Sequence, residues 1–409
     1  MNAAAASTPV SPLRVLHLNS LLTGGGTDDQ CVKLAFGLHQ FGQRVWIAGP
    51  AGREFSKVIK NLGVPLLATP SEGPLKLAFI LSAARFLRHE QIQIIHGHHG
   101  RDLWPTILAA KLSGVRPKIV LTRHMAKSPS SWASRHFLLR QCNALIAVSE
   151  FVARVLRAGV YEPDSPNPER RARPPLRGDH SKIHVIHGGI DTTRFTPWPR
   201  DDARVRSQRA EWGLQENEFA FGVAGGFDLP RGKGQREFLA AAASVQKLVP
   251  NARFLLIGRG NMEETLRQDI ARLGLQKVAR LTGHCANMPQ AMNTLDCLVH
   301  PQVGTEALGL VVCEAHACGV PVVASALDGI PEAFEIGGCG RLVLPEDIAG
   351  LADAMRVQLS LPPPGATERE RLHAAVERKF SLAVCACAHV ALYANLRGVP
   401  TTSVLPRSS

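Results

Sequence analysis

Short apolar runs with the pattern of buried strands alternate with helical stretches along almost the whole chain. The strand-like runs fall into two blocks: RVLHLN, RVWIAG, IQIIHGH, KIVLTRH and ALIAVSE, and then FAFGVAGG, RFLLIGRG, VARLTGH, CLVHP, PVVAS and GRLVLP. This alternation is typical of βα units, because neighbouring parallel strands must be joined by a crossover. The sequence therefore predicts an α/β fold with two doubly wound sheets that face each other and bind ligands beyond the carboxyl ends of their strands.

Length, cysteine usage and hydropathy limit the class of protein and the compartment in which it is expected. The 409 residues, 45% of them hydrophobic, suffice for two or three domain cores. The nine cysteines include no CxxC pair, which favours buried thiols in a reducing compartment. The first residues lack the basic start and apolar core of a secretion signal, and no apolar run approaches the length of a membrane span. We therefore expect a cytoplasmic chain with disordered tails at 1–12 and 399–409.

The strongest functional signal is the segment GTEALGLVVCEAHACGVPVVAS, residues 304–325. Glu306 and Glu314 flank a glycine-led turn into a short amphipathic helix, which Gly319 and Pro321 end. Eight positions of helix would place the two carboxylates roughly 12 Å apart, a separation that suits the two ends of one ligand.

The start of that helix is a candidate diphosphate site. Unpaired backbone N–H groups at a helix start attract phosphate oxygens. The groups in question belong to Leu308, Gly309 and Leu310. Glu314 could then accept hydrogen bonds from a ribose diol, and Glu306 could face a sugar beyond the phosphates. The alternative is a solvated helix that carries two surface acids.

These residues resemble the E-x7-E region of retaining glycosyltransferases of family 4, and the similarity extends over nearly the whole chain. In the first half it includes RVLHLNSLLTGGGTDDQCVKLAFGLHQFGQRVWIAG, IIHGHHG, VLTRH, AVSE and HVIHGGIDTTRF. In the second half it includes GVAGGFDLPRGKGQREFLAA, ARFLLIGRG and the loop DGIPEAFEIGGCGRLVLPED.

The resemblance implies a GT-B fold, in which two Rossmann-like domains face a central cleft. Residues 13–193 would form the N-terminal, acceptor-binding domain, and residues 194–376 the nucleotide-sugar-binding domain. The helical segment 377–398 would cross back onto the N-terminal domain. Catalysis would then require closure of the cleft.

The resemblance also implies a reaction. A sugar would pass from a nucleotide-diphosphate sugar to an acceptor hydroxyl with retention of configuration, and the departing diphosphate would take the proton. No metal and no cofactor is implied. Glu306 would hold the donor sugar and Glu314 the ribose, while His98 would line the acceptor side near the transferred sugar. Gly25 and Gly26 correspond to the family's glycine loop.

The leaving diphosphate needs positive charge, which Lys233 in RGKG could supply; the alternative is an ordinary loop lysine. The family usually has an arginine where this chain has Gly226, and Arg231 could replace that charge. The family's usual asparagine is replaced by Gly188, so a donor contact from that side chain is lost.

Three histidines in HGHHG offer other interpretations. His96, His98 and His99 could bind a metal, but only Asp102 is a nearby acid, and a structural role for His98 is a further alternative. A nicotinamide site is disfavoured because GGGTDD does not have the GxGxxG spacing.

The net charge of +13 favours an anionic partner, and a merely solubilising charge is the alternative. Part of it lies in the Pro- and Arg-rich segment 163–182, which we expect to be a mobile surface loop. More comes from the helical stretches beside AVSE, namely from Arg135, Arg140, Arg154 and Arg157. An anionic membrane surface or a phosphorylated acceptor would fit, whereas nucleic acid is disfavoured by 5% aromatic content and the lack of a recognisable module.

The sequence thus predicts a retaining glycosyltransferase, peripheral on the inner face of the plasma membrane. Its acceptor would be a glycan or a lipid-linked glycan of lipopolysaccharide or other cell-surface assembly. Two alternatives remain. One is a sugar phosphorylase or glycogen-type synthase, and the other is a catalytically inactive nucleotide- or carbohydrate-binding module, which the glycine at 226 suggests.

Overall fold

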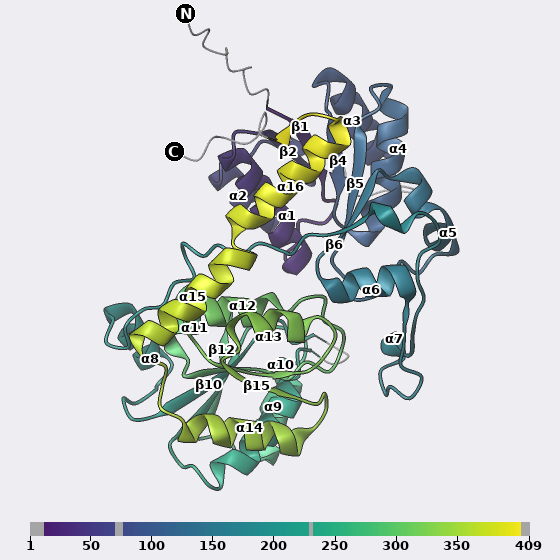
Figure 1. Ribbon diagram of the computed structural model, residues 1–409. Coiled ribbons are helices and arrows are strands. Elements are labelled where there is room, and N and C mark those ends of the chain that lie inside the picture. Colours follow the sequence, from purple (N-terminus) through teal and green to yellow (C-terminus); the bar gives the residue numbers. More distant parts are fainter. Residues whose placement is uncertain (1–11, 70–76, 229–231, 402–409) are drawn as a thin grey trace, which may run out of the picture. The chain divides into compact units, whose positions relative to one another are not determined.

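The computed structural model describes residues 12–69, 77–228 and 232–401 (Figure 1). Its contacts divide the chain into two compact units. Unit 1 consists of Met1–Val160, Arg173–Gly189 and Leu382–Ser409, and unit 2 consists of Tyr161–Ala172 and Ile190–Ser381.

Unit 1 is built on a seven-stranded parallel sheet in the order β3-β2-β1-β4-β5-β6-β9. Its strands are β1 (Arg14–Leu18), β2 (Arg44–Gly49), β3 (Leu66–Ala68), β4 (Ile94–Gly97), β5 (Lys118–Arg123), β6 (Ala144–Ala147) and β9 (Ile183–Val185). Its helices are α1 (Gly26–Gln40), α2 (Glu54–Asn61), α3 (Leu77–His89), α4 (Leu103–Ser113), α5 (Trp132–Gln141), α6 (Glu150–Ala158) and α16 (Leu382–Arg397), with short 3-10 turns at Gly100–Asp102 and His180–Lys182. The central strands are apolar and buried because helices cover both faces of such a sheet.

Unit 2 is built on a six-stranded parallel sheet in the order β12-β11-β10-β13-β14-β15. Its strands are β10 (Phe219–Ala224), β11 (Ala252–Ile257), β12 (Ala279–Gly283), β13 (Cys297–His300), β14 (Val322–Ser325) and β15 (Gly340–Val343). Its helices are α8 (Ala203–Glu211), α9 (Gln235–Gln246), α10 (Glu263–Arg272), α11 (Met288–Thr294), α12 (Leu310–Ala317), α13 (Ile330–Gly337), α14 (Ile348–Ser360) and α15 (Ala366–Phe380). The two parallel sheets confirm the predicted fold class.

The C-terminal helix α16 belongs to unit 1, although it follows the whole of unit 2 in sequence. It packs against α1, and Val390, Tyr393 and Ala394 are fully buried in the core of unit 1. This return was predicted, but it begins at Leu382 rather than at 377, because α15 continues to Phe380 and Ser381 is extended. Among the described helices, α16 included, none is long and apolar enough to cross a lipid bilayer.

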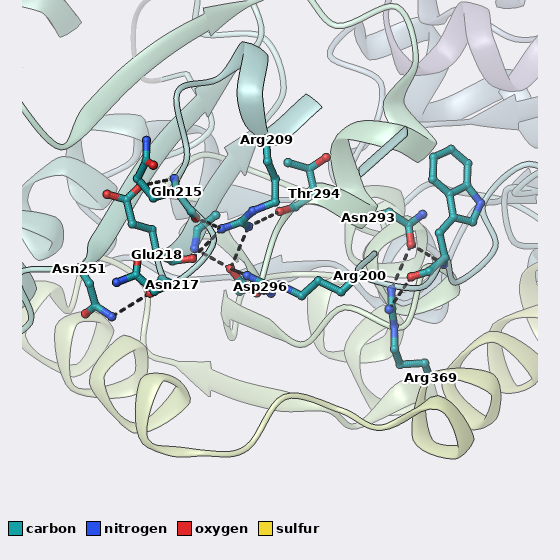
Figure 2. A network of polar contacts seen from close by, with 12 residues as sticks. Arg200, Arg209, Gln215, Asn217, Glu218, Asn251, Asn293, Thr294, Asp296 and Arg369 are labelled. Atoms are coloured by element: carbon teal, nitrogen blue, oxygen red, sulfur yellow. Dashed lines mark hydrogen bonds and ion pairs between the residues drawn. The ribbon is translucent and has the colours of Figure 1, made fainter. Parts of the chain in front are cut away.

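A polar network fixes the amino ends of two central strands in unit 2 (Figure 2). Asp296, just before β13, accepts hydrogen bonds from Arg200, from Arg209 and, at 2.7 Å, from the backbone N–H of Ala220 in β10. Arg209 also donates to the carbonyl oxygens of Thr294 and Glu218. The network therefore ties β10 to β13 at one end and so aligns the loops that follow them at the other.

A second anchor at the same end of the sheet comes from α15. Arg369 donates to the side chain of Asn293 (Figure 2). It also donates to the carbonyl oxygens of Trp198 and Cys318. A cavity of about 390 Å³ borders these residues and Pro321. Because it lies at the amino ends of the strands, it is away from the carboxyl-end loops where ligands bind in such folds.

The basic segment 163–182 differs from the expected loop. It contains α7 (Pro168–Arg171), and β8 (Ala172–Arg173) pairs with β7 (Val160–Tyr161). Arg173 is only 1% exposed, since it donates to the carbonyl oxygen of Ala126 and lies over the ring of Phe151. Its guanidinium is therefore buried against Ala126 and Phe151 rather than presented to a partner.

The domain limits also differ from those expected. The contacts change unit after Gly189, a few residues before the predicted limit at 193, and residues 161–172 are grouped with unit 2. Most of the predicted tails, 1–12 and 399–409, lies outside the described residues.

Replacement of Tyr393 by Phe tests the packing of α16. The Tyr393 hydroxyl shares a 2.7 Å hydrogen bond with Nδ1 of His96, and both side chains are fully buried. Tyr393→Phe should destabilise unit 1 by about 1–3 kcal/mol, because a buried ring nitrogen loses its partner. Chemical denaturation should show this loss, whereas Tyr161→Phe, at a 59% exposed tyrosine, should unfold like the wild type. Equal stabilities would contradict the contact.

Candidate active site

Three loops that follow neighbouring strands of unit 2 bring charged side chains together. The strands β10, β13 and β14 are adjacent in the sheet. Lys233 follows β10, Glu306 follows β13 and Asp328 follows β14. Because the strands are parallel, their carboxyl ends and these loops lie at one edge.

Lys233 and Glu306 form an ion pair at this edge. The Nζ of Lys233 lies 2.8 Å from Oε2 of Glu306, and the two side chains are 35% and 17% exposed. Burial alone would raise the pKa of Glu306, but the charge and hydrogen bond of Lys233, with His300 and the Ala307 N–H, hold it below its ordinary value. Glu306 is therefore ionised at neutral pH.

The backbone around both charges is fixed. The N–H of Lys233 donates to Oε1 of Gln235 at 2.7 Å. The N–H of Glu306 donates to Oδ2 of Asp328 at 3.1 Å, and its carbonyl oxygen accepts from the N–H of Gly329. The backbone N–H groups of Lys233 and Glu306 are therefore held in place by side chains of their own or neighbouring loops.

The position after Lys233, Gly234, requires a glycine. Its φ is +85°, a left-handed conformation, and an added Cβ would lie 1.9 Å from the carbonyl oxygen of Pro301. No side chain fits there, so Gly234 allows the loop of Lys233 to approach the end of β13 closely.

The start of α12 is the second part of the site. The helix begins at Leu310, with Gly309 before it at φ +84°. Within the described chain, the N–H groups of Leu308, Gly309 and Leu310 have no hydrogen-bond acceptor, whereas that of Val312 bonds to Gly309. A short stretch of backbone at the helix start therefore offers donors to an anion.

The positions of Glu306, Leu308 and Glu314 relative to α12 differ in part from those expected. Glu306 lies in the loop before α12, as the sequence indicated, and several of the positions between it and Glu314 are not helical, so the helical estimate of the distance to Glu314 does not apply. Leu308 also precedes the helix, and its side chain is buried in the core of unit 2. Glu314 lies in the second turn of α12 and is half-buried.

The position of Gly226 is not forced by packing. Among the described residues, a Cβ there would meet the Asp228 carboxylate at 3.5 Å and the carbonyl oxygen of Arg259 at 3.9 Å, which are ordinary contact distances. A Cβ would fit among these atoms, so the described packing does not require a glycine here. Arg231, the predicted substitute charge, lies outside the described residues.

In unit 1 the glycine loop is held by a buried carboxylate. Gly25 precedes α1 with φ +103°, and Gly26 is its first residue. Asp28 is 1% exposed and accepts hydrogen bonds from the N–H of Gly24, from Asn19 and from His99. Burial would raise the pKa of Asp28, but these three hydrogen bonds lower it below its usual value.

His98 belongs to a buried group of histidines. Its Nε2 lies 2.8 Å from Nδ1 of His17, its Nδ1 faces His124 at 3.4 Å, and its side chain is 2% exposed. Burial lowers the pKa of His17 to about 3 and places that of His98 well below its ordinary value. These rings are therefore neutral at physiological pH.

The same group contains possible metal ligands. One ring nitrogen from each of His17, His96 and His98 lies within 4.8 Å of the others. Both nitrogens of His96 already bond to hydroxyls, those of Tyr393 and Thr122. A metal would have to displace these bonds, so the group is best described as a hydrogen-bonded cluster.

Several residues of these sites were missed from the sequence. Asp28, Asn19 and His17 carry no motif that marks them, since their partners are distant in sequence. Asp328 was quoted only as part of a loop, and His300 only as the end of a strand.

Two Rossmann-like units, a terminal helix that returns to the first unit, and an ion-paired carboxylate at the strand ends of the second define the class of GT-B glycosyltransferases. Residues 24–164 match the family "Glycosyltransferase Family 4", and residues 218–360 match "Glycosyl transferases group 1". The chain belongs to the family 4 type of glycosyltransferase.

Individual relatives agree with this assignment. The chain is 26% identical over 311 residues to the lipopolysaccharide core biosynthesis mannosyltransferase LpsB of Rhizobium meliloti, covering 74% of this chain and 80% of LpsB. It is 38% identical over 133 residues to a phosphatidyl-myo-inositol mannosyltransferase of Mycobacterium leprae, but this match spans only 34% of that protein and 32% of this chain. The crystal structure of Anabaena Alr3699/HepE in complex with UDP has a TM-score of 0.76 and 21% identity, covering 94% of this chain and all of that one, and supports the fold.

Proposed function

We propose that this protein moves a sugar from a nucleotide-diphosphate sugar to an acceptor hydroxyl, with retention of configuration and without a metal. The observation that carries the proposal is the Lys233–Glu306 ion pair at the carboxyl edge of unit 2, in the same loop system as the unbonded N–H groups that open α12. A cation and backbone donors suit a diphosphate, and a carboxylate suits sugar hydroxyls.

In this proposal different residues of unit 2 bind different parts of the donor. Lys233 and the N–H groups of Leu308, Gly309 and Leu310 bind the diphosphate and stabilise the negative charge that grows as the sugar leaves. Glu306 binds hydroxyls of the transferred sugar, and Glu314 binds the ribose. A diphosphate oxygen on the same face of the sugar takes the acceptor proton, so no carboxylate has to form a covalent bond.

Unit 1 would supply the acceptor side. Gly25 and Gly26 would contribute open backbone near the donor phosphates, and His98 would lie beside the transferred sugar. Because both ring nitrogens of His98 face other histidines, its side chain can reach a substrate only if the histidine cluster rearranges. Arg231, if it replaces the absent arginine at 226, would add charge to the diphosphate site.

The relatives support a chemical class for the donor and for the acceptor. HepE is described with bound UDP, and LpsB as a mannosyltransferase of lipopolysaccharide core synthesis. We propose a nucleotide-sugar donor and a glycan or lipid-linked glycan acceptor in cell-surface assembly. Incubation with UDP-, GDP- and ADP-sugars and such an acceptor, followed by NMR of the product, should show the anomeric configuration of the donor. An inverted product would contradict the proposal.

Removal of two side chains should separate nucleotide binding from catalysis. Glu314→Ala should weaken nucleotide binding by roughly 1–3 kcal/mol, because a hydrogen-bonding carboxylate is lost. Lys233→Ala should lower turnover by about 100-fold, far more than it alters folding, because a charge that stabilises the leaving group is lost. Titration calorimetry and turnover rates measure the two effects, and Lys247→Ala, at an exposed lysine after α9, is the control. Unchanged affinity in the first variant or wild-type turnover in the second would remove that residue from the site.

We further propose that one face of unit 1 contacts anionic lipid. The helices α3 and α4 pack against each other and expose leucines at i,i+4 spacing. These are Leu77 (56% exposed), Leu81 (37%), Leu108 (43%) and Leu112 (52%). Exposed basic residues lie on or beside the same helices, namely Arg85, Lys111 and Arg116. Leucines among basic residues suit the interface of an anionic bilayer.

Vesicle sedimentation tests this surface. The wild type should sediment with phosphatidylglycerol vesicles and much less with phosphatidylcholine vesicles. Leu108→Glu with Leu112→Glu should reduce binding by at least about fivefold, because apolar area is lost and negative charge is added. Leu248→Glu, at a leucine of unit 2 that is 62% exposed, should bind like the wild type. Equal binding of both variants would contradict the proposed surface.

A further inference from the structure

His300 is a buried histidine beside the ion pair that has no assigned role. It is the last residue of β13, and its side chain is 1% exposed. Within the described residues, neither of its ring nitrogens has a hydrogen-bond partner. Its Nε2 lies 3.8 Å from Oε2 of Glu306, the same oxygen that bonds to Lys233. A buried polar group without a partner is unfavourable, so a partner in another state of the site is expected.

Binding of the donor sets up a competition for Lys233. In the structure its ammonium group is 2.8 Å from Glu306. A diphosphate carries more negative charge than one carboxylate, so it attracts the ammonium group away from Glu306. The carboxylate is only 17% exposed, and a charge at such a site is strongly destabilised when its counter-ion leaves.

We infer that His300 exchanges places with Lys233: when Lys233 turns to the donor diphosphate, the Nε2–H of His300 donates to Glu306 and keeps that carboxylate in position for the sugar. The contact requires the 3.8 Å separation to shorten by less than 1 Å, to an ordinary hydrogen-bond distance of about 3 Å. His300 is thus a positioning residue. The inference rests on the proposed binding of a nucleotide-diphosphate sugar at this site.

The charge state of the histidine suits this exchange. Burial lowers the pKa of His300 to about 4, although Glu306 acts in the opposite direction. The ring is therefore neutral at pH 7 and has one N–H to donate. Among the described residues, the other charged groups at Glu306 are Lys233 and Asp328, and Asp328 bonds to the backbone N–H of Glu306 rather than to its carboxylate. Once Lys233 has turned away, His300 is the described side chain placed to donate to the carboxylate, beside the backbone N–H of Ala307.

Two substitutions separate this role from simple packing. His300→Phe keeps a planar ring and removes the donor, whereas His300→Asn restores a short N–H donor. His316→Asn is the matched control, because His316 is also fully buried in unit 2 with one unpartnered nitrogen but bonds to the carbonyl oxygen of Cys339. Thermal midpoints of all the variants show whether each one folds.

The measurements are the affinity for a free nucleoside diphosphate, the turnover of the nucleotide sugar and the pH profile of turnover. His300→Phe should bind the nucleoside diphosphate within about twofold of the wild type and lose at least about tenfold in turnover. Its acid limb should move to higher pH, because loss of a donor raises the pKa of Glu306. His300→Asn should recover part of the turnover. His316→Asn should have wild-type turnover, and the acid limb of its pH profile should not shift.

Wild-type turnover in a folded His300→Phe protein would overturn the inference while leaving the proposed function intact. Equal losses of nucleoside diphosphate affinity and turnover would also overturn it, because they would show a general defect of the donor site. If the wild type neither binds nucleoside diphosphates nor transfers sugar, the proposed function and this inference fail together.

Discussion

The ion pair between Lys233 and Glu306 depends on close contact between two loops that are far apart in sequence. A partly buried carboxylate needs its counter-charge, and a displacement of either loop would leave it unpaired. Gly234 provides the contact, because its left-handed backbone lies against Pro301 where no Cβ fits. At the opposite ends of the same strands, Asp296 ties β10 to β13. The site thus depends on backbone alignment along the whole length of two strands.

Two acidic side chains of unit 1 are buried and stabilise loops by accepting hydrogen bonds. Asp28 and Asp102 are almost fully buried and accept hydrogen bonds from neighbouring backbone and side chains, including the N–H groups of Gly24 and Ser20. They shape the loops after β1 and β4 and are not presented to a ligand. The neutral histidine cluster beside them is also internally bonded. Among the described residues, charged side chains that a ligand could reach are therefore found more readily in unit 2, where Lys233 and Glu306 are partly exposed.

The sequence predicted the layers of this fold because they follow from local periodicity. Each apolar run named in the sequence analysis corresponds to a strand, and Glu306, Gly309 and Glu314 stand out because they are close in sequence. In the large sheet of unit 1, β3 and β9 were missed, since each has only three residues and β9 also follows a Pro- and Arg-rich segment. The two-residue strands β7 and β8 were missed as well.

What was missed depends on contacts that no local pattern encodes. The burial of Arg173 follows from Ala126 and Phe151, and the importance of His300 follows from the loops that surround Glu306. The predicted roles of His98, Lys233, Glu306 and Glu314 stay predictions, because the structure gives their positions and not their ligands.

Thermal unfolding of the wild-type protein tests the proposed diphosphate site most directly. It is measured with nucleoside diphosphates, the matching nucleosides and the matching nucleotide sugars, with NAD as a control. One nucleotide series should stabilise the protein, by about 2.7 kcal/mol at a ligand concentration of 100 times Kd. The nucleoside without phosphates should stabilise far less, because Lys233 and the start of α12 bind the diphosphate. Equal shifts with nucleoside and diphosphate, or no shift with any nucleotide, would contradict a diphosphate site at the carboxyl edge of unit 2 and would favour an inactive binding module.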